Sequence, residues 1–254
     1  MKEINLEICV DTIESAKNAV IGGATRLEIC SALSEGGLTP TPGLIKRIRE
    51  ISPIPIYAMI RVRGGNFVYS REEMDIMLDD LKTLKELRVD GFVFGALTSD
   101  RQINVSDCKE IIDAAYPLPV TFHRAFDVLV EEPSVAIEIL INLGFKRILS
   151  SGRKETAEKG LDLLSEMCKI ADKKISIMPG CGITPDNLMK IKLGTGAEEF
   201  HASAKCKKQL WPGFDRQTNS IRMGVVSEDD LIMVTNSDTV RQMVNILLDD
   251  IPHA

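Results

Sequence analysis

The sequence predicts an α/β fold, a (β/α)8 barrel of the TIM type, from three observations. The chain has 254 residues, close to the roughly 250 that such a barrel usually takes. Short β-branched segments alternate about eight times with longer segments of helical periodicity. No low-complexity or Pro/Ser-rich linker divides the chain. We therefore expect residues 1–254 to form a single domain around one parallel barrel.

Eight strands are expected, each a short run rich in β-branched or apolar residues that precedes a helix-like segment. Their predicted ranges are residues 4–9, 26–30, 55–60, 91–94, 119–123, 147–150, 175–178 and 199–201. Three helix starts carry capping signals: Thr41 and Thr184 each precede a proline, and Ser70 precedes Glu73 by three positions. The first two pair an N-cap hydroxyl with a proline at the first helical position, and the third is a capping box.

A long segment, residues 205–236, separates the last predicted strand from the last predicted helix, residues 238–249. Connections within a compact domain are mostly much shorter. We interpret this segment as a lid or as a contact between subunits. It contains the only tryptophan, Trp211, for which an anchored loop is the simpler interpretation.

Composition and charge exclude several classes of protein. The net charge is −6 and the isoelectric point is near 5.3, so there is no broad positive field to attract nucleic acid. No apolar run approaches the roughly 20 residues that cross a bilayer, and the first residues, MKEINLEICV, do not resemble a signal peptide. The six cysteines form no CxxC pair, which argues against a zinc ribbon or a thioredoxin motif. These features favour a cytoplasmic protein with free thiols and no membrane partner.

Polar residues are expected inside the barrel, at the carboxyl ends of its strands. Successive strand residues face opposite sides, and the outward side must be apolar to receive the helices. This rule places Glu7 and Cys9 of the first strand inside. The second strand repeats the letters LEIC, so the rule also places Glu28 and Cys30 inside. The other residues predicted to face inward are Met59, Arg61, Thr121, His123, Ser176, Met178, Glu199 and His201.

Buried carboxylates are costly unless they are paired, so Glu7 and Glu28 need partners or a ligand. The partners expected for them are Arg61, Arg63 and Arg124. One interpretation is a closed network of ion pairs that plugs the barrel and binds nothing. The other is a functional site, which in this fold lies at the carboxyl-terminal rim.

The first candidate site is a cysteine pair. Cys9 and Cys30 should lie at matching heights on neighbouring strands, which are about 4.8 Å apart. Thiolates favour Cu(I), with thioether and imidazole as additional ligands. Those ligands could come from Met59, Met178, His123 and His201. The alternative is that both cysteines are small buried hydrophobic residues.

The second candidate site is a glycine-rich turn, MPGCGITPDN, that leads from the seventh strand into a helix. Free N–H groups at Gly180 and Gly182, next to the positive end of the helix, could hold phosphate or carboxylate. Ser151, after the sixth strand, could add a hydroxyl donor. The two glycines could equally serve only to form a tight turn.

The third candidate site consists of charged residues around the carboxyl-terminal rim of the barrel. The guanidinium groups of Arg61, Arg63 and Arg124 could bind carboxylate or phosphate. In an enzyme, protons would be moved by His123 or His201 and these imidazoles would be oriented by Glu7 and Glu28. Lys146 and Lys174 lie at the starts of their strands, away from the rim, so no lysine is expected to be well placed for Schiff-base chemistry and an aldolase mechanism of that kind is disfavoured.

The chain carries eight specific motifs in a fixed order. They read LEICVD, RLEICSALSEGGLTP, MIRVRGGNFVYS, DGFVFGALT, PVTFHRAFD, RILSSG, IMPGCGIT and EFHASA. Together they resemble those of the CutC copper-homeostasis family over about residues 5–204. The resemblance implies a (β/α)8 barrel, a cytoplasmic location, a role in copper homeostasis and a homo-oligomer. For some members it also implies Cu(I) binding through a cysteine pair that matches Cys9 and Cys30.

Two segments depart from the family pattern. RVRGGNF replaces RPRGGDF, so Val62 and Asn66 stand where the family has proline and aspartate. If that aspartate is catalytic in relatives, the activity of this chain is affected. PGCGI replaces PGGGI, and the added Cys181 either supplies a further thiol or, as we favour, fills space.

Two functions follow from these sites. The first is a copper-homeostasis protein that binds Cu(I) through Cys9 and Cys30, with no organic cofactor implied. The alternative is a TIM-barrel enzyme that acts on a small anionic or phosphorylated metabolite.

Overall fold

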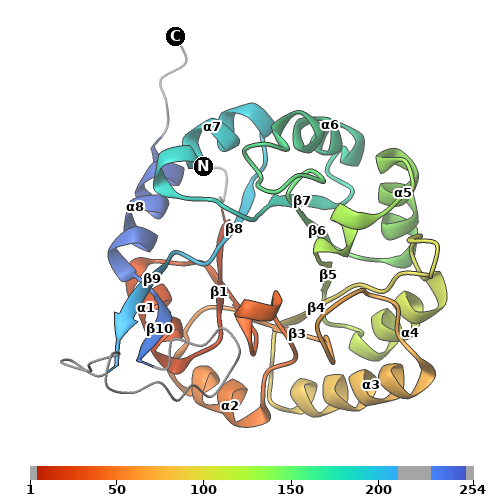
Figure 1. Cartoon of the computed structure of the whole chain (residues 1–254), viewed down its shortest axis with the longest axis horizontal. Coiled ribbons are helices and arrows are strands. Elements are labelled where there is room, and N and C mark those ends of the chain that lie inside the picture. The colour runs from red at the N-terminus through yellow and green to blue at the C-terminus, as the bar shows by residue number, and fades with distance from the viewer. Residues whose placement is uncertain (1–4, 211–229, 250–254) are drawn as a thin grey trace, which may run out of the picture.

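A ring of eight parallel strands surrounded by helices makes up most of the protein (Figure 1). The computed structural model describes residues 5–210 and 230–249. The strands of the ring are β1 (Asn5–Val10), β2 (Arg26–Ile29), β3 (Ile56–Met59), β4 (Gly91–Phe94), β5 (Val120–Phe122), β6 (Arg147–Ser150), β7 (Ser176–Pro179) and β8 (Glu199–Ala202). Each strand pairs with the next along the chain from β1 to β7, and β8 pairs with β1. The predicted (β/α)8 barrel is therefore confirmed.

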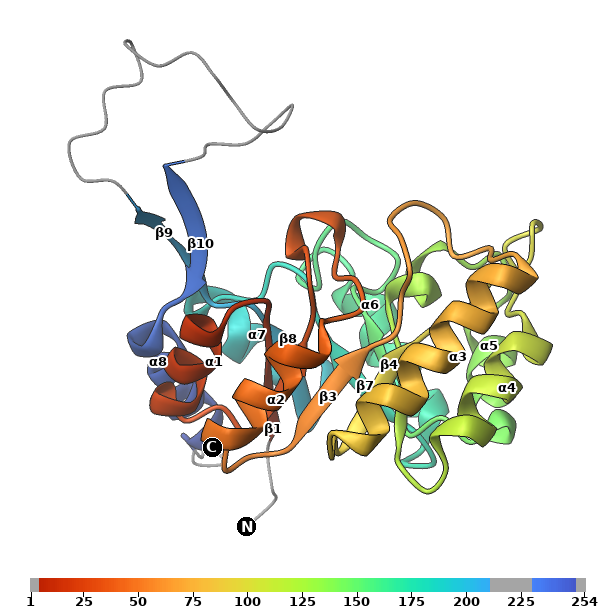
Figure 2. The same ribbon diagram turned by 90° about the horizontal axis from the view of Figure 1, so that it is seen from below.

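In the part of the chain that the structure describes, eight α-helices cover the outside of the ring, and the first seven alternate with the strands (Figures 1 and 2). They are α1 (Ile13–Gly22), α2 (Pro42–Ile51), α3 (Arg71–Glu86), α4 (Val105–Ala115), α5 (Pro133–Leu143), α6 (Leu161–Ala171), α7 (Pro185–Thr195) and α8 (Ser237–Leu248). Two short 3-10 helices, η1 (Leu33–Glu35) and η2 (Arg124–Val128), lie in the loops after β2 and β5. No helix among residues 5–210 and 230–249 is long and apolar enough to cross a membrane.

The outward face of the strands is apolar, as the alternation predicts. Leu6 and Ile8 of β1 and Leu27 of β2 are fully or almost fully buried in one apolar cluster. The same cluster contains Ile45 and Ile48 on the buried face of α2. Apolar burial between the ring and its helices therefore leaves Glu7 and Cys9 on the inner side of β1.

The predicted helix starts are present. The Thr41 side chain accepts a hydrogen bond from Leu44 N, and Ser70 and Glu73 make both hydrogen bonds of a capping box at α3. Replacing Ser70 with alanine should lower the free energy of unfolding by about 1 kcal/mol. Urea denaturation followed by circular dichroism measures this. Thr83→Ala, exposed in the last turn of the same helix, is the control and should cause no loss, because alanine is the better helix former.

The long segment before the last helix begins and ends as a two-stranded antiparallel ribbon, β9 (Lys205–Gln209) and β10 (Leu231–Thr235). In Figure 2 the ribbon projects beyond the barrel, on the side where the loops follow the carboxyl ends of the strands. Trp211 and the residues up to 229 lie outside the described residues. The interpretation of this segment as a lid or a subunit contact stays a prediction.

Candidate functional site

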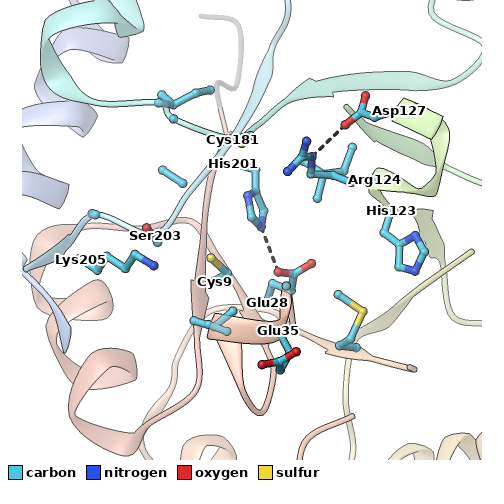
Figure 3. Close-up of a pocket in the computed structure, with 18 of the residues that line it drawn as sticks. Cys9, Glu28, Glu35, His123, Arg124, Asp127, Cys181, His201, Ser203 and Lys205 are labelled. Atoms are coloured by element: carbon cyan, nitrogen blue, oxygen red, sulfur yellow. Dashed lines mark hydrogen bonds and ion pairs between the residues drawn. The ribbon is translucent and has the colours of Figure 1, made fainter. Parts of the chain in front are cut away.

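A pocket of about 660 Å³ opens at the carboxyl ends of the strands, as the fold predicts. Figure 3 shows its residues arriving from β1, β2, β8 and the loop after β5. The predicted site residues that line it are Cys9, Glu28, Arg61, His123, Arg124, Gly182 and His201. Five further site residues predicted from the sequence do not line this pocket, namely Glu7, Cys30, Arg63, Ser151 and Gly180.

Three of the lining residues form a compact group of metal-binding atoms. One ligand atom each from Cys9, Glu28 and His201 lies within 4.8 Å of the other two. His201 Nε2 is 3.0 Å from Glu28 Oε2 (Figure 3) and 3.8 Å from Glu7 Oε1. Burial alone would lower the pKa of His201, but Glu28 and Cys9 outweigh it and hold the pKa well above its usual value. These two neighbours therefore favour the protonated imidazole.

Cys30 does not lie level with Cys9, so that part of the sequence prediction was wrong. Cys9 pairs with Glu28 across the β1–β2 ladder, and Val10 with Ile29. The strands of a closed barrel are staggered, and here the stagger shifts the second LEIC motif by two residues. Cys30 packs among Tyr57, Met59 and Val93, and its thiol donates to Glu28 Oε2 at 3.6 Å. Burial and then Glu28 raise the pKa of this thiol.

An ion-pair network lies below the pocket, and its arginines are not those that the sequence predicted. Arg26 bonds Glu7 Oε2 and lies 2.7 Å from Glu199 Oε2. Arg147 Nε also lies 2.7 Å from Glu199 Oε2. Both guanidinium groups lie over the Tyr57 ring, at 5.0 and 5.1 Å from its centroid. Arginine therefore holds Glu7, as one interpretation predicted, but Glu7 Oε1 lacks a hydrogen-bond partner among the described residues. Glu28 bonds His201 and Cys30 instead of an arginine.

Arg61 is almost fully buried and is held by main-chain oxygens. Its guanidinium donates to the carbonyls of Glu35, Gly37 and Gly65 and lies 5.0 Å from the centroid of the Phe67 ring. Its Nε has no hydrogen-bond partner among the described residues. Arg61 is thus not the partner of Glu7 or Glu28 that the sequence suggested.

His123 is also buried, and it is neutral. Its Nδ1 accepts a hydrogen bond from Ala125 N at 3.2 Å, while its Nε2 has no partner among the described residues. Burial, followed by the nearby charge of Arg61, lowers the pKa of His123 to about 3. Since Nδ1 is an acceptor, the ring proton is on Nε2. At neutral pH His123 is a hydrogen-bond donor and a weak base.

The loop after β6 already holds an anion, the carboxylate of Asp127. Ser151 donates to Asp127 through both its N–H and its hydroxyl, and the N–H of Arg153 donates to it as well. Arg124 Nε lies 2.8 Å from Asp127 Oδ2 (Figure 3), and its Nη2 donates to Ser151. The N–H and hydroxyl of Ser151, of which the hydroxyl was predicted to bind a ligand, therefore donate to Asp127 instead.

The glycine-rich turn after β7 has a steric reason for its glycines. A Cβ at Gly180 would lie 2.5 Å from Leu149 Cδ1, and Gly182 has a positive φ of 71°. Gly182 and the start of α7 line the pocket. Cys181 also lines it, although its thiol donates to the carbonyl of Glu155 at 3.1 Å. Anion binding by this turn stays a prediction.

Two further outcomes concern charged residues at the rim. Arg63 bonds Glu73 at the start of α3 and lies outside the pocket lining. Lys205, on β9, lines the pocket (Figure 3), and it was not among the lysines considered for Schiff-base chemistry. Sequence analysis missed Lys205 because it assigned this residue to the long segment after the last strand rather than to the barrel mouth.

Comparison with known proteins agrees with the fold and with the motifs. The family model described as the CutC family matches residues 4–206. The chain belongs to the CutC family. It is 46% identical over 219 residues to the Homo sapiens copper homeostasis protein cutC homolog, covering 86% of this chain and 79% of the relative. It is also 46% identical over 250 residues to the Drosophila melanogaster cutC homolog, covering 96% of this chain and 94% of the relative.

Solved structures agree with this assignment. The CutC protein from Streptococcus agalactiae has a TM-score of 0.75 and 33% identity to the chain, covering 79% of this chain and 98% of that one. Phosphoribosylanthranilate isomerase from Thermotoga maritima has a TM-score of 0.58 at 13% identity, covering 96% and 98%. The second likeness shows only that CutC shares the TIM-barrel fold.

Proposed function

We propose that this CutC protein acts in copper homeostasis and binds Cu(I) at the mouth of its barrel, through Cys9 and His201. The names of its relatives support the copper role. The observation that carries the binding proposal is the convergence of Cys9, Glu28 and His201 within 4.8 Å. A thiolate and an imidazole are soft enough to favour Cu(I) over the hard cations that carboxylates prefer.

Glu28 has a supporting role in this proposal. Its carboxylate bonds His201, and a carboxylate beside a metal-binding imidazole fixes the orientation of the ring. Metal binding must displace the proton that Glu28 and Cys9 stabilise on His201. Copper binding should therefore release protons and weaken as the pH falls.

Cys30 is the second sulfur that the resemblance to the family implies. To bind copper together with Cys9 it would have to leave its hydrogen bond with Glu28 and its packing against Tyr57 and Met59. We therefore propose that Cys9 is the essential sulfur and that Cys30 contributes less. In a reducing cytoplasm, where we place the protein, both would remain thiols.

Anaerobic Cu(I) titration against a competing chelator tests this proposal. Cys9→Ser should weaken Cu(I) binding at least tenfold, because serine removes the only sulfur ligand of the three-residue group. Cys30→Ser should have a smaller effect. Cys108→Ser is the matched control, since Cys108 is buried in α4 against Ala96 and away from the pocket; it should leave copper binding unchanged.

Two results would change the proposal. Unchanged copper affinity in Cys9→Ser would remove the site altogether. Equal losses in Cys9→Ser and Cys30→Ser would mean that copper draws the two sulfurs together, as the family resemblance implies, and that His201 is not the second ligand. His201→Ala, measured alongside, distinguishes the two ligand pairs. It should weaken Cu(I) binding if the ligands are Cys9 and His201, and leave it unchanged if they are Cys9 and Cys30.

A further inference from the structure

The pocket is far larger than a metal ion requires. Its volume of about 660 Å³ falls within the 300–1,000 Å³ typical of sites for small organic molecules. The residues of the proposed copper site, Cys9, Glu28 and His201, come from β1, β2 and β8, whereas another part of the wall comes from β3 and from the loops after β3 and β5. That part, which we call the β3/β5 wall, consists of Met59, Arg61, Phe67 and His123.

Arg61 brings a buried positive charge to the β3/β5 wall, and it makes no ion pair with any acidic side chain in the part of the chain that the structure describes. Only 5% of its surface is exposed, and its guanidinium contacts three carbonyl oxygens and the face of the Phe67 ring. Burial raises the pKa of the nearby Tyr69 to about 12, so that phenol stays neutral and cannot balance the charge. A buried cation without a counter-ion is costly, which makes a bound anion favourable here.

His123 adds a second unused donor to the same wall. It is 4% exposed and its ring centroid lies 4.8 Å from that of Phe67, the ring on which Arg61 also lies. Both Arg61 Nε and His123 Nε2 are buried and lack partners within residues 5–210 and 230–249. Buried donors of this kind are rare unless a ligand or water satisfies them.

We infer that the β3/β5 wall is a second binding site, for the carboxylate or phosphate group of a small organic anion, and that Arg61 and His123 donate to that group. Met59 and Phe67 provide apolar surface for the rest of the ligand. The site goes beyond the copper proposal, and it locates the anion elsewhere than the Ser151 loop, whose donors bind Asp127. The opposite side of the pocket, with Cys9, stays open to the metal.

Isothermal titration of the metal-free full chain tests the inference with three probes: succinate, glycerol 3-phosphate and inorganic phosphate. At least one should bind, and the comparison of succinate with the two phosphates tells which anionic group the wall prefers. Arg61→Gln should weaken that binding at least tenfold. Arg63→Gln is the matched control, because Arg63 is two residues away, already pairs with Glu73 and lies outside the pocket; it should bind the probe as the parent does.

A measurement on the unaltered protein guards against a variant that fails to fold. The chain has three histidines, so the ring Nε2–H of His123 can be assigned in a proton–nitrogen spectrum. Its resonance should move as the probe saturates the site. Absence of binding by all three probes, or binding that leaves this resonance in place, would overturn the inference.

Cys9→Ser separates this inference from the copper proposal. It should lose Cu(I) binding and keep the affinity for the anionic probe. If Cys9→Ser abolishes anion binding while Arg61→Gln leaves it unchanged, the anion binds at the metal ligands and the second site does not exist. Failure of Cu(I) binding in the parent would leave the anion result unaffected.

Discussion

Replacing Arg26 with leucine is expected to lower the free energy of unfolding by about 3–5 kcal/mol, because it removes one partner of a buried ion pair. Arg26 is 6% exposed and lies between Glu7, which is fully buried, and Glu199. Glu199 would keep Arg147, whereas among the described residues the one cationic neighbour left to Glu7 would be His201, at 3.8 Å. The main cost is therefore an uncompensated carboxylate at Glu7.

The same substitution should make the protein more sensitive to acid. Burial alone would raise the pKa of Glu199, but Arg147 and Arg26 outweigh it and lower the pKa below its usual value. A lowered pKa in the folded state stabilises the fold above the unfolded pKa, and this stabilisation is lost as the pH falls through the folded pKa. Without Arg26 the pKa of Glu199 rises, so acid unfolding should begin at a higher pH than in the parent.

Urea denaturation at neutral pH, and acid titration followed by circular dichroism, measure both effects. Arg47→Leu is the control, since Arg47 makes an exposed pair with Glu50 on α2 and should cost less than about 1 kcal/mol. Adding Glu7→Gln to Arg26→Leu should recover part of the loss, because it removes the unpaired charge. A loss as small as that of Arg47→Leu would mean that the network does not stabilise the fold.

The barrel could be predicted because its signals are local. Alternation of apolar and polar residues in β1 and β2 assigns each side chain to one face, and the capping residues Ser70 and Thr41 mark helix starts. The same alternation places Arg26 on the inner face of β2, two residues before Glu28. Arg26 was not among the predicted partners of Glu7, because it lies at the amino end of its strand and the partners were expected at the carboxyl ends.

Heights along the barrel could not be predicted in the same way. The matching LEIC motifs predicted that Cys9 and Cys30 lie at the same height. The stagger between strands depends on closure of the whole ring, so it cannot be predicted from a single motif. The partner of Ser151 was hidden for a similar reason. Asp127 lies in the loop after β5, whereas Ser151 follows β6. The spacing of the two residues in the sequence does not predict their contact.

Gly160→Ala is the second substitution with a large expected effect, a loss of about 3 kcal/mol in the free energy of unfolding. A Cβ at Gly160 would lie 1.9 Å from the carbonyl oxygen of Ser151 and 2.9 Å from Cα of Gly152. Both obstacles are backbone atoms, so no side-chain rotation can make room. The loop that they belong to would have to move, and with it the N–H groups that bind Asp127.

Chemical denaturation measures the loss, and Gly43→Ala provides a control with the opposite sign. Gly43 lies in the first turn of α2, and a Cβ there would meet no atom within 4 Å. Alanine is the better helix former, so Gly43→Ala should stabilise the protein by up to about 1 kcal/mol. Because Asp127 pairs with Arg124 at the pocket, Gly160→Ala should also disturb Arg124. A Gly160→Ala protein as stable as the parent would show that this loop is free to shift, and that the close approach of the two backbones does not position Asp127.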